Sequence, residues 1–167
     1  MKTVWEGKHI VVRERDGWEY VERKTATEAV VVMGKTDDGK IVFVEQERKP
    51  VASRVIEFPA GLIGDEDDAG PDATARKELE EETGFTCSDV ERMAGGPSSA
   101  GITSEIIHYF RATGLRRTGD GGGVGSEKIT VHLVPEREVV DWLRGKEREG
   151  LLIDAKLWSG LFWLTLA

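Results

Sequence analysis

Short apolar runs separated by turn residues occur along most of the chain, and they predict more strands than helices. The runs within residues 27–33 and 41–44 are rich in valine, and Asp37, Asp38 and Gly39 between them are typical of a hairpin turn. A loosely alternating segment at residues 4–24, with a turn at 15–17, predicts another antiparallel ribbon. Further strands are expected at residues 51–58, 87–93, 106–112 and 129–134.

Three segments have the pattern of helices. Residues 71–83 begin at Pro71, which suits the first helical position, and stop before Gly84, which suits the left-handed residue that closes a helix. Residues 136–149 carry an apolar face at helical spacing, and Asp154 is a candidate N-cap for a last helix at 155–166. Many strands with few helices predict an α+β fold in which helices cover a mixed sheet.

Two segments are expected to be loops because of their glycine, proline and serine content. They are residues 95–101 and the glycine-rich residues 114–126. The second segment fits neither the P-loop pattern nor the dinucleotide fingerprint, so it is not interpreted as a phosphate cradle. We expect it to be mobile.

The helix predicted at 71–83 carries an unusual concentration of acid. Glu78, Glu81 and Glu82 are three and four positions apart and share one face, where like charges repel each other unless a cation lies among them. A second face can pack inward and consists of Ala75, Leu79 and Thr83. Mg²⁺ prefers oxygen ligands of this kind. A solvated acidic surface is the alternative, because most runs of charge are only surface.

Composition limits the possible functions. The chain has 167 residues, 39% hydrophobic and 32% charged, as expected for one soluble domain. A net charge of −8 disfavours nucleic acid, and a phosphate substrate would require a metal and local arginines. Cys87 has no disulfide partner, no secretion signal is recognisable, and the apolar run at 157–167 is too short to span a bilayer. We expect a cytoplasmic protein without nucleic-acid or membrane partners.

The acidic segment resembles the Nudix box, Gly-x5-Glu-x7-Arg-Glu-U-x-Glu-Glu-x-Gly-U, in which U is bulky and apolar. Residues 77–85, Lys-Glu-Leu-Glu-Glu-Glu-Thr-Gly-Phe, match its second half, with lysine in place of arginine. The spacing from Gly61 to Lys77 is two residues longer than in the box, which places an insertion within 64–70. The early glutamate is replaced by an acid among Glu66, Asp67 and Asp68. Lysine is a poorer bidentate partner than arginine, so the loop half matches less well.

Other segments resemble the ADP-ribose and ADP-sugar pyrophosphatase branch of this family. They are Gln46-Glu47-Arg48, residues 57–62 (Glu-Phe-Pro-Ala-Gly-Leu), residues 99–105 with Ala100 where proline is usual, and parts of residues 6–23. The resemblance implies a Nudix fold, with a mixed sheet between helices in α/β/α layers. It divides the chain into an N-terminal antiparallel strand extension at 1–26, used in dimerisation, and a Nudix domain at 27–167.

The resemblance also implies a set of site residues. Glu78 and Glu82 would bind Mg²⁺, or Mn²⁺ in its place, together with the backbone carbonyl of Ala60. Glu81 would be a ligand or a catalytic group beside them. The branch takes its catalytic base from a distant loop, and Glu127 is the candidate here, carried into place by the mobile loop. A surface glutamate at a strand start is the alternative for Glu127.

Substrate contacts are implied in the same way. Arg23 and Arg48 would contact phosphate, because arginine matches phosphate geometry. Trp18 would stack on the base, with packing within the N-terminal ribbon as its alternative. The remaining pocket residues would be Glu57, Leu62 and, with weaker support, Glu105.

The implied function is metal-dependent hydrolysis of a nucleoside diphosphate sugar by a homodimer, with ADP-ribose as the favoured substrate, giving AMP and ribose 5-phosphate. One alternative is another nucleotide sugar such as GDP-mannose. The other is a non-catalytic nucleotide-binding module on the same scaffold. Retention of Glu78, Glu81, Glu82 and a candidate base disfavours the module, because binding does not require all four.

Overall fold

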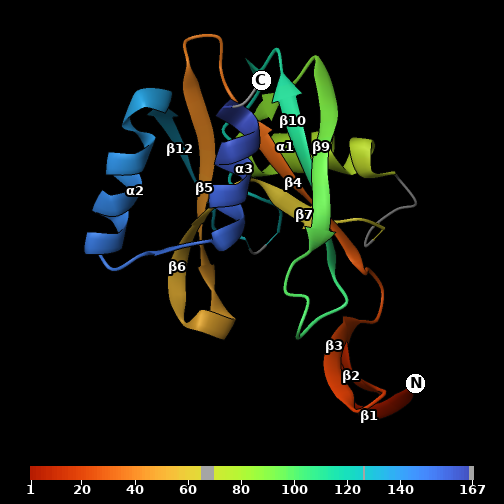
Figure 1. Cartoon of the computed structure of the whole chain (residues 1–167). Helices are drawn as coiled ribbons and strands as arrows, with labels where there is room; N and C mark the ends of the chain where they lie inside the picture. Colours follow the sequence, from red (N-terminus) through yellow and green to blue (C-terminus); the bar gives the residue numbers. More distant parts are fainter. Residues whose placement is uncertain (65–69, 126, 166–167) are drawn as a thin grey trace.

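The computed structural model describes residues 1–64, 70–125 and 127–165. It is an α+β structure with mixed sheets covered by helices (Figure 1), as the sequence predicts. The helices are α1 (Pro71–Thr83), α2 (Val139–Arg148) and α3 (Ala155–Thr165). The strands are β1 (Lys2–Glu6), β2 (Ile10–Arg15), β3 (Trp18–Arg23), β4 (Glu28–Gly34), β5 (Lys40–Arg48), β6 (Ser53–Glu57), β7 (Ala60–Leu62), β8 (Phe85–Thr86), β9 (Asp89–Pro97), β10 (Ile106–Thr113), β11 (Arg116–Arg117), β12 (Thr130–Pro135) and β13 (Leu152–Ile153).

Two four-stranded sheets form the body of the protein. Their strand orders are β7-β4-β10-β9 and β12-β5-β6-β13. The pairs β4–β10 and β6–β13 are parallel and the other pairs in these sheets are antiparallel. Neighbouring residues of β4 point to opposite faces, so Val31 joins the core under α2 and α3, and Val30 joins the core under α1. A valine run buried on both faces is what this position requires.

The N-terminal strands form a separate antiparallel sheet, β1-β2-β3, which projects from the body (Figure 1). Asp16 and Gly17 both have positive φ, the conformation that a tight hairpin turn between β2 and β3 requires. Two backbone hydrogen bonds join the sheet to the body, from the Val21 amide to the Ile102 carbonyl and from the Ser104 amide to the Val21 carbonyl. The predicted ribbon is therefore confirmed and gains a third strand.

Helix α1, which carries the cluster of glutamates, begins and ends at the residues that the sequence predicts. Pro71 is at its N-terminus, and Gly84 closes it in the left-handed conformation at φ 71°. Ala75, Leu79 and Thr83 are fully buried, as their spacing predicts. The last helix also begins as predicted, because Asp154 Oδ1 accepts the amide of Lys156 at 2.7 Å. Residues 66–68 of the box and position 166 of that helix lie outside the described residues.

Two loop predictions need correction. Residues 95–97 were expected in a loop, but they are the end of β9, where Gly95 pairs with His108 and Pro97 with Ile106. Proline is tolerated there because β9 is an edge strand, whose outward amides need no partner.

The second correction concerns the glycine-rich residues 114–126, expected to be a loop throughout, whereas part of this segment is a strand. Arg116 and Arg117 pair with β8, and four later amides, those of Thr118, Gly119, Gly122 and Gly123, donate to carbonyls at the end of α1. The strand expected at 51–58 is also shorter, because Lys49–Val51 form a 3-10 turn. Within the described residues, no helix is both long and apolar enough to cross a membrane.

Candidate active site

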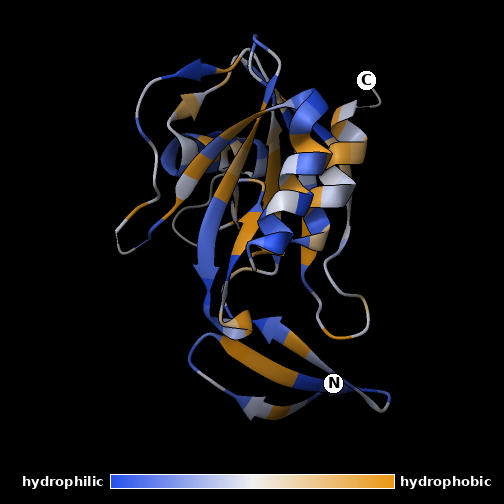
Figure 2. Ribbon diagram, turned by 90° about the vertical axis from the view of Figure 1, so that its left-hand side faces the viewer, coloured by the Kyte–Doolittle hydropathy of each residue, from blue (hydrophilic) through white to orange (hydrophobic). Residues whose placement is uncertain are grey.

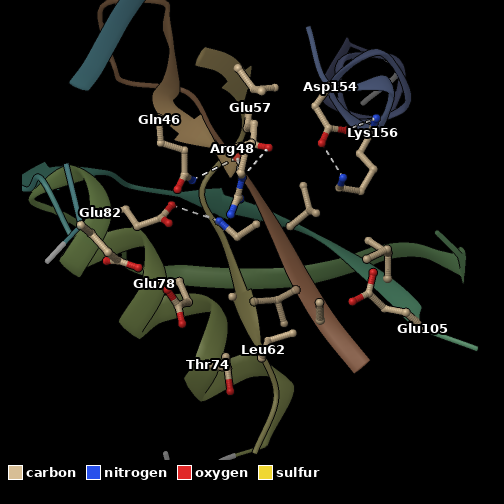
Figure 3. Close-up of a pocket in the computed structure, with 18 of the residues that line it drawn as sticks. Gln46, Arg48, Glu57, Leu62, Thr74, Glu78, Glu82, Glu105, Asp154 and Lys156 are labelled. Atoms are coloured by element: carbon tan, nitrogen blue, oxygen red, sulfur yellow. Dashed lines mark hydrogen bonds and ion pairs between the residues drawn. The ribbon is translucent and has the colours of Figure 1, made fainter. Parts of the chain in front are cut away.

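A cleft of about 830 Å³ opens between α1 and the strands that carry Arg48 and Glu57. Strands β4 and β7 form its floor, and β13 and the start of α3 form the wall that faces α1 (Figure 3). The cleft brings together residues distant in sequence that were predicted as site residues. They are Arg23, Arg48, Glu57, Ala60, Leu62, Glu78, Glu81, Glu82, Glu105 and Glu127.

The wall formed by α1 is acidic. Glu78, Glu81 and Glu82 all line the cleft, which confirms that they share one face. Glu78 lies directly against β7, since a Cβ atom added to Gly61 would lie within 1.9 Å of its carboxylate. Glycine at the start of the box thus leaves the space that the Glu78 carboxylate fills.

Glu82 is the most buried of these carboxyls, with 4% of its surface exposed. Its Oε2 accepts the backbone amide of Ala60 at 3.1 Å (Figure 3). Burial raises the pKa of Glu82 to about 8, and the charges of Glu78 and Glu127 act in the same direction. The hydrogen bond from Ala60 and the charge of Arg48 oppose this rise without cancelling it. Burial therefore favours the protonated form of Glu82 in the protein without a metal.

Glu127 lies beside this wall, although it is distant in sequence. Its side chain lines the cleft, and its charge influences Glu82. Glu127 Oε2 accepts the backbone amide of Val124 at 2.8 Å, so its own loop holds the carboxylate in place. This position is consistent with a base or a metal ligand.

Across the cleft from α1, the side chains of β5 and β6 form ion pairs, so this wall is close to neutral. Arg48 donates to both oxygens of Glu57, the shortest contact being 2.6 Å, and Gln46 donates to Glu57 at 3.0 Å (Figure 3). Burial acts to lower the pKa of Arg48, but the hydrogen bonds and charge of Glu57 outweigh it and raise the pKa above its ordinary value. Arg48 is therefore charged, and Glu57 fixes the orientation of its guanidinium group in the cleft.

A second ion pair closes one end of the cleft. Arg23 Nε donates to Glu105 Oε1 at 2.8 Å, joining β3 to the segment before β10. Leu62 lies on the floor, at the end of β7. Arg23 and Glu105 thus stabilise the N-terminal sheet against the body as well as lining the cleft.

The sequence interpretation missed one pair in the cleft. Asp154 Oδ2 accepts Lys156 Nζ at 2.5 Å, and both side chains line the wall that faces α1 (Figure 3). Asp154 was singled out only as a helix cap. The sequence around Asp154 and Lys156 matches no site motif, so nothing in it marked these residues as part of a cleft.

Trp18 does not line the cleft of a single chain. It lies on β3 with 68% of its surface exposed. Stacking of Trp18 on a base bound in the cleft would require a second copy of the chain or a movement of the sheet.

The residues present fit a hard divalent cation. The acidic wall offers oxygen donors, three of them carboxylates on one helical face, and burial, followed by the charges of Glu78 and Glu127, raises the pKa of Glu82. Among the described residues, no three acidic, histidine or cysteine groups are already arranged as a complete ligand set. A cation would draw the carboxylates together and remove their repulsion.

Comparison with known proteins shows the family. Residues 25–152 match the model of the NUDIX domain, which is most of the chain and includes the entire acidic helix. The protein therefore belongs to the Nudix family.

Several characterised relatives share this domain. The chain is 40% identical over 101 residues to a methanol dehydrogenase activator of Bacillus methanolicus and 37% identical over 123 residues to an ADP-ribose pyrophosphatase of Bacillus subtilis. These alignments cover 60% and 68% of this chain, and 54% and 65% of the relatives. A GDP-mannose pyrophosphatase of Cronobacter sakazakii is 33% identical over 77% of this chain and 68% of its own length.

A crystal structure of an ADP compounds hydrolase has the same fold. It superimposes with a TM-score of 0.75 over 98% of this chain and 88% of its own, at 20% identity. The Nudix fold expected from the sequence is thereby confirmed.

Proposed function

We propose that the protein is a metal-dependent hydrolase of nucleoside diphosphate sugars, with ADP-ribose as the favoured substrate. The observation that carries the proposal is the acidic face of α1 in the cleft, where Glu78, Glu81 and the buried Glu82 lie beside Glu127. A nucleotide-binding module would gain nothing from four carboxylates facing an anionic ligand.

The chain's residues divide the chemistry between the two walls. Glu78, Glu82 and the carbonyl of Ala60 would hold Mg²⁺ or Mn²⁺, with Glu81 as a further ligand or catalytic group. When bound, the cation neutralises the diphosphate and lowers the pKa of water. Glu127 accepts the proton of the attacking water, a role for which its position beside Glu82 is suited. Arg48, oriented by Glu57, contacts the phosphates, and Arg23 lies at the end of the cleft near Glu105.

The choice of sugar and base rests on similarity. ADP-ribose pyrophosphatases and GDP-mannose pyrophosphatases are both among the relatives. The motifs at residues 46–48 and 57–62 resemble the ADP-ribose branch, which favours ADP-ribose with GDP-mannose as the alternative. Water attack on the diphosphate of ADP-ribose gives AMP and ribose 5-phosphate.

The test is a substrate panel read by product identity. ADP-ribose, ADP-glucose, GDP-mannose and nucleoside triphosphates are incubated with the protein and Mg²⁺, Mn²⁺ or EDTA, and the products are separated by chromatography. We expect AMP and ribose 5-phosphate from ADP-ribose and no turnover in EDTA. Faster GDP-mannose hydrolysis would favour the alternative substrate, and binding without hydrolysis of any compound would refute the proposed enzyme.

We also propose that residues 1–26 mediate a homodimer and that the protein is cytoplasmic. The separate N-terminal sheet exposes Val4, Trp5 and Trp18 at 47%, 55% and 68%. Figure 2 shows hydrophobic stretches on this sheet, below the body of the protein. Apolar surface of this kind is stabilised by contact with a partner. The cytoplasmic location rests on the single cysteine and stays a prediction.

A further inference from the structure

The glycine-rich segment after β11 is attached to the end of the helix that carries the acidic wall. Thr118 and Gly119 donate their amides to the Gly84 carbonyl at 2.8 and 3.1 Å. Gly122 donates to the Glu82 carbonyl at 2.9 Å, and Gly123 to the Glu81 carbonyl at 3.0 Å. The last carbonyls of a helix have no partner within it, so this segment satisfies the backbone of two residues of the acidic wall.

The contact requires glycine on both sides. A Cβ atom at Gly84 would lie 2.3 Å from the Gly119 carbonyl oxygen, and one at Gly121 would lie 2.4 Å from the backbone carbon of Thr83. Both atoms that would be struck are backbone, which cannot rotate away. Gly121 also has a φ of +68°, which side chains rarely adopt.

The same segment holds Glu127. Its amide donates to the Val124 carbonyl at 3.2 Å, and its Oε2 accepts the Val124 amide at 2.8 Å. A Cβ atom at Gly123 would lie 2.5 Å from that Oε2, so glycine leaves the space that the carboxylate fills. Ile129 then donates to the Gly122 carbonyl at 3.2 Å and returns the chain to β12.

We infer that Gly121 and Gly123 are positioning residues for Glu127. The inference rests on the proposed function of Glu127 as the base. Gly121 lets the segment approach the end of α1, and Gly123 leaves room for the carboxylate, so Glu127 is fixed relative to Glu82 before substrate binds. Positioning in advance matters because a displacement of about 1 Å can lower a rate about 100-fold. The segment is thus a fixed support, in contrast to the swinging loop that its composition suggests.

The test compares Gly121→Ala with Gly125→Ala. Gly125 is a matched control because its φ of +64° gives similar backbone strain, whereas its Cβ would meet nothing within 4 Å. Hydrogen exchange, followed by mass spectrometry without substrate, should show protection of the bonded amides of Thr118, Gly119, Gly122 and Gly123 in the native protein and in Gly125→Ala. Gly121→Ala should lose at least about tenfold in protection there. Unprotected amides in the native protein would overturn the inference, whatever the protein hydrolyses.

Steady-state kinetics then test whether the effect of Gly121 on turnover depends on Glu127. Gly121→Ala should lower kcat by about 10- to 100-fold with little change in KM. In a Glu127→Gln background, which itself should lower kcat about 100-fold or more, the same substitution should change kcat less than about twofold. An equal loss in both backgrounds would show that Gly121 acts only on α1 and would overturn the positioning role.

A second variant applies if Gly121→Ala fails to fold. Gly123→Ala displaces the Glu127 carboxylate, and the atoms that its Cβ would meet belong to the side chains of Glu127 and Ile129. It should keep the exchange protection of residues 118–122 and still lower kcat at least about fivefold. Unchanged kcat with the displaced carboxylate would overturn the role of Gly123. If the native protein hydrolyses nothing, the proposed function fails, and the exchange comparison still tests the attachment to α1.

Discussion

At the scale of residues, the cleft is organised by how charge is paired. Arg48 with Glu57, Arg23 with Glu105, and Lys156 with Asp154 form close ion pairs on or near the neutral wall. The acidic wall differs, because burial and neighbouring carboxylates raise the pKa of Glu82. In the proposed mechanism a cation would bind beside α1, and Arg48 would contact phosphate from the other wall.

Replacing Glu82 by glutamine should separate activity from stability. Because its pKa is about 8 without metal, the native carboxyl is largely protonated at neutral pH, and glutamine can also accept the Ala60 amide. We expect Mg²⁺-dependent turnover to fall about 100-fold or more, and the free energy of unfolding to change by less than about 1 kcal/mol. Urea denaturation and steady-state kinetics give the two numbers.

The control for this substitution is Glu80→Gln on the same helix. Glu80 is exposed, lies away from the cleft and contacts Thr118 at 3.3 Å. The Glu80→Gln protein should retain near-normal turnover. A Glu82→Gln protein with native activity would remove Glu82 from the metal site.

The same carboxyl predicts how the metal-free protein responds to pH. A folded-state pKa of about 8 lies above the ordinary value of 4.5, so the folded protein binds the proton more tightly than the unfolded chain does. Its contribution to stability is complete below about pH 4.5 and is lost as pH rises through about 8. The loss has an upper limit of a few kcal/mol.

Thermal unfolding in EDTA from pH 6 to 9 measures this dependence. We expect Tm to fall over that range, Mg²⁺ to restore it at the alkaline end, and Glu82→Gln to flatten the profile. A metal-free Tm with the same pH dependence in both proteins would exclude Glu82 as the cause.

At the scale of elements, glycine positions decide how closely neighbours approach. Gly61 admits Glu78 against β7, Gly84 admits the glycine-rich segment against α1, and Gly160 admits α3 against the core. A Cβ atom at Gly160 would lie 2.6 Å from the ring of Phe58 and 3.1 Å from the sulfur of Met33. These close approaches bring the cleft walls together.

Gly160→Ala should destabilise the protein although alanine favours helix. The propensity gain is about 1 kcal/mol, whereas overpacking a well-packed core costs about 1–3 kcal/mol, so a net loss of about 1 kcal/mol is expected. Gly145→Ala in α2 is the matched control, because its Cβ would meet only Arg148 at 3.9 Å, and it should stabilise by up to about 1 kcal/mol. Urea midpoints compare the two, and equal shifts would contradict the packing argument.

At the scale of the whole molecule, the N-terminal sheet stands apart from a body that already has its own core. The ion pair of Arg23 with Glu105 and the backbone contacts at Val21 fix where it leaves the body. This arrangement leaves Trp5 and Trp18 exposed, and the proposed dimer would bring Trp18 near the cleft of the other copy.

Trp5→Glu should therefore weaken the dimer. Loss of a tryptophan at an interface costs about 2 kcal/mol or more, which is at least about thirtyfold in dissociation constant. Phe162→Glu on α3 is the control, because Phe162 is equally exposed at 56% and lies on the body. Light scattering over a dilution series measures both, and a native protein that is monomeric throughout would refute the proposed dimer.

The sequence by itself determined features that depend on neighbours along the chain. The limits of α1, its acidic face and its buried face follow from helical spacing, Pro71 and Gly84, and the hairpin turns follow from glycine and aspartate. The sequence motif also connected residues 77–85 to the family. These features are local, because hydrogen bonds within a helix or a tight turn join residues only a few positions apart.

Only the tertiary structure decided what depends on distant contacts. It placed Gly95 to Pro97 in an edge strand, where proline's missing amide is tolerated. It brought Lys156 and Asp154 into the cleft. It also attached the glycine-rich segment to α1, because glycines without side chains allow two backbones to approach as readily as they allow motion. The glycine content shows that both outcomes are open to the segment. Only the packed fold shows that its backbone lies against α1.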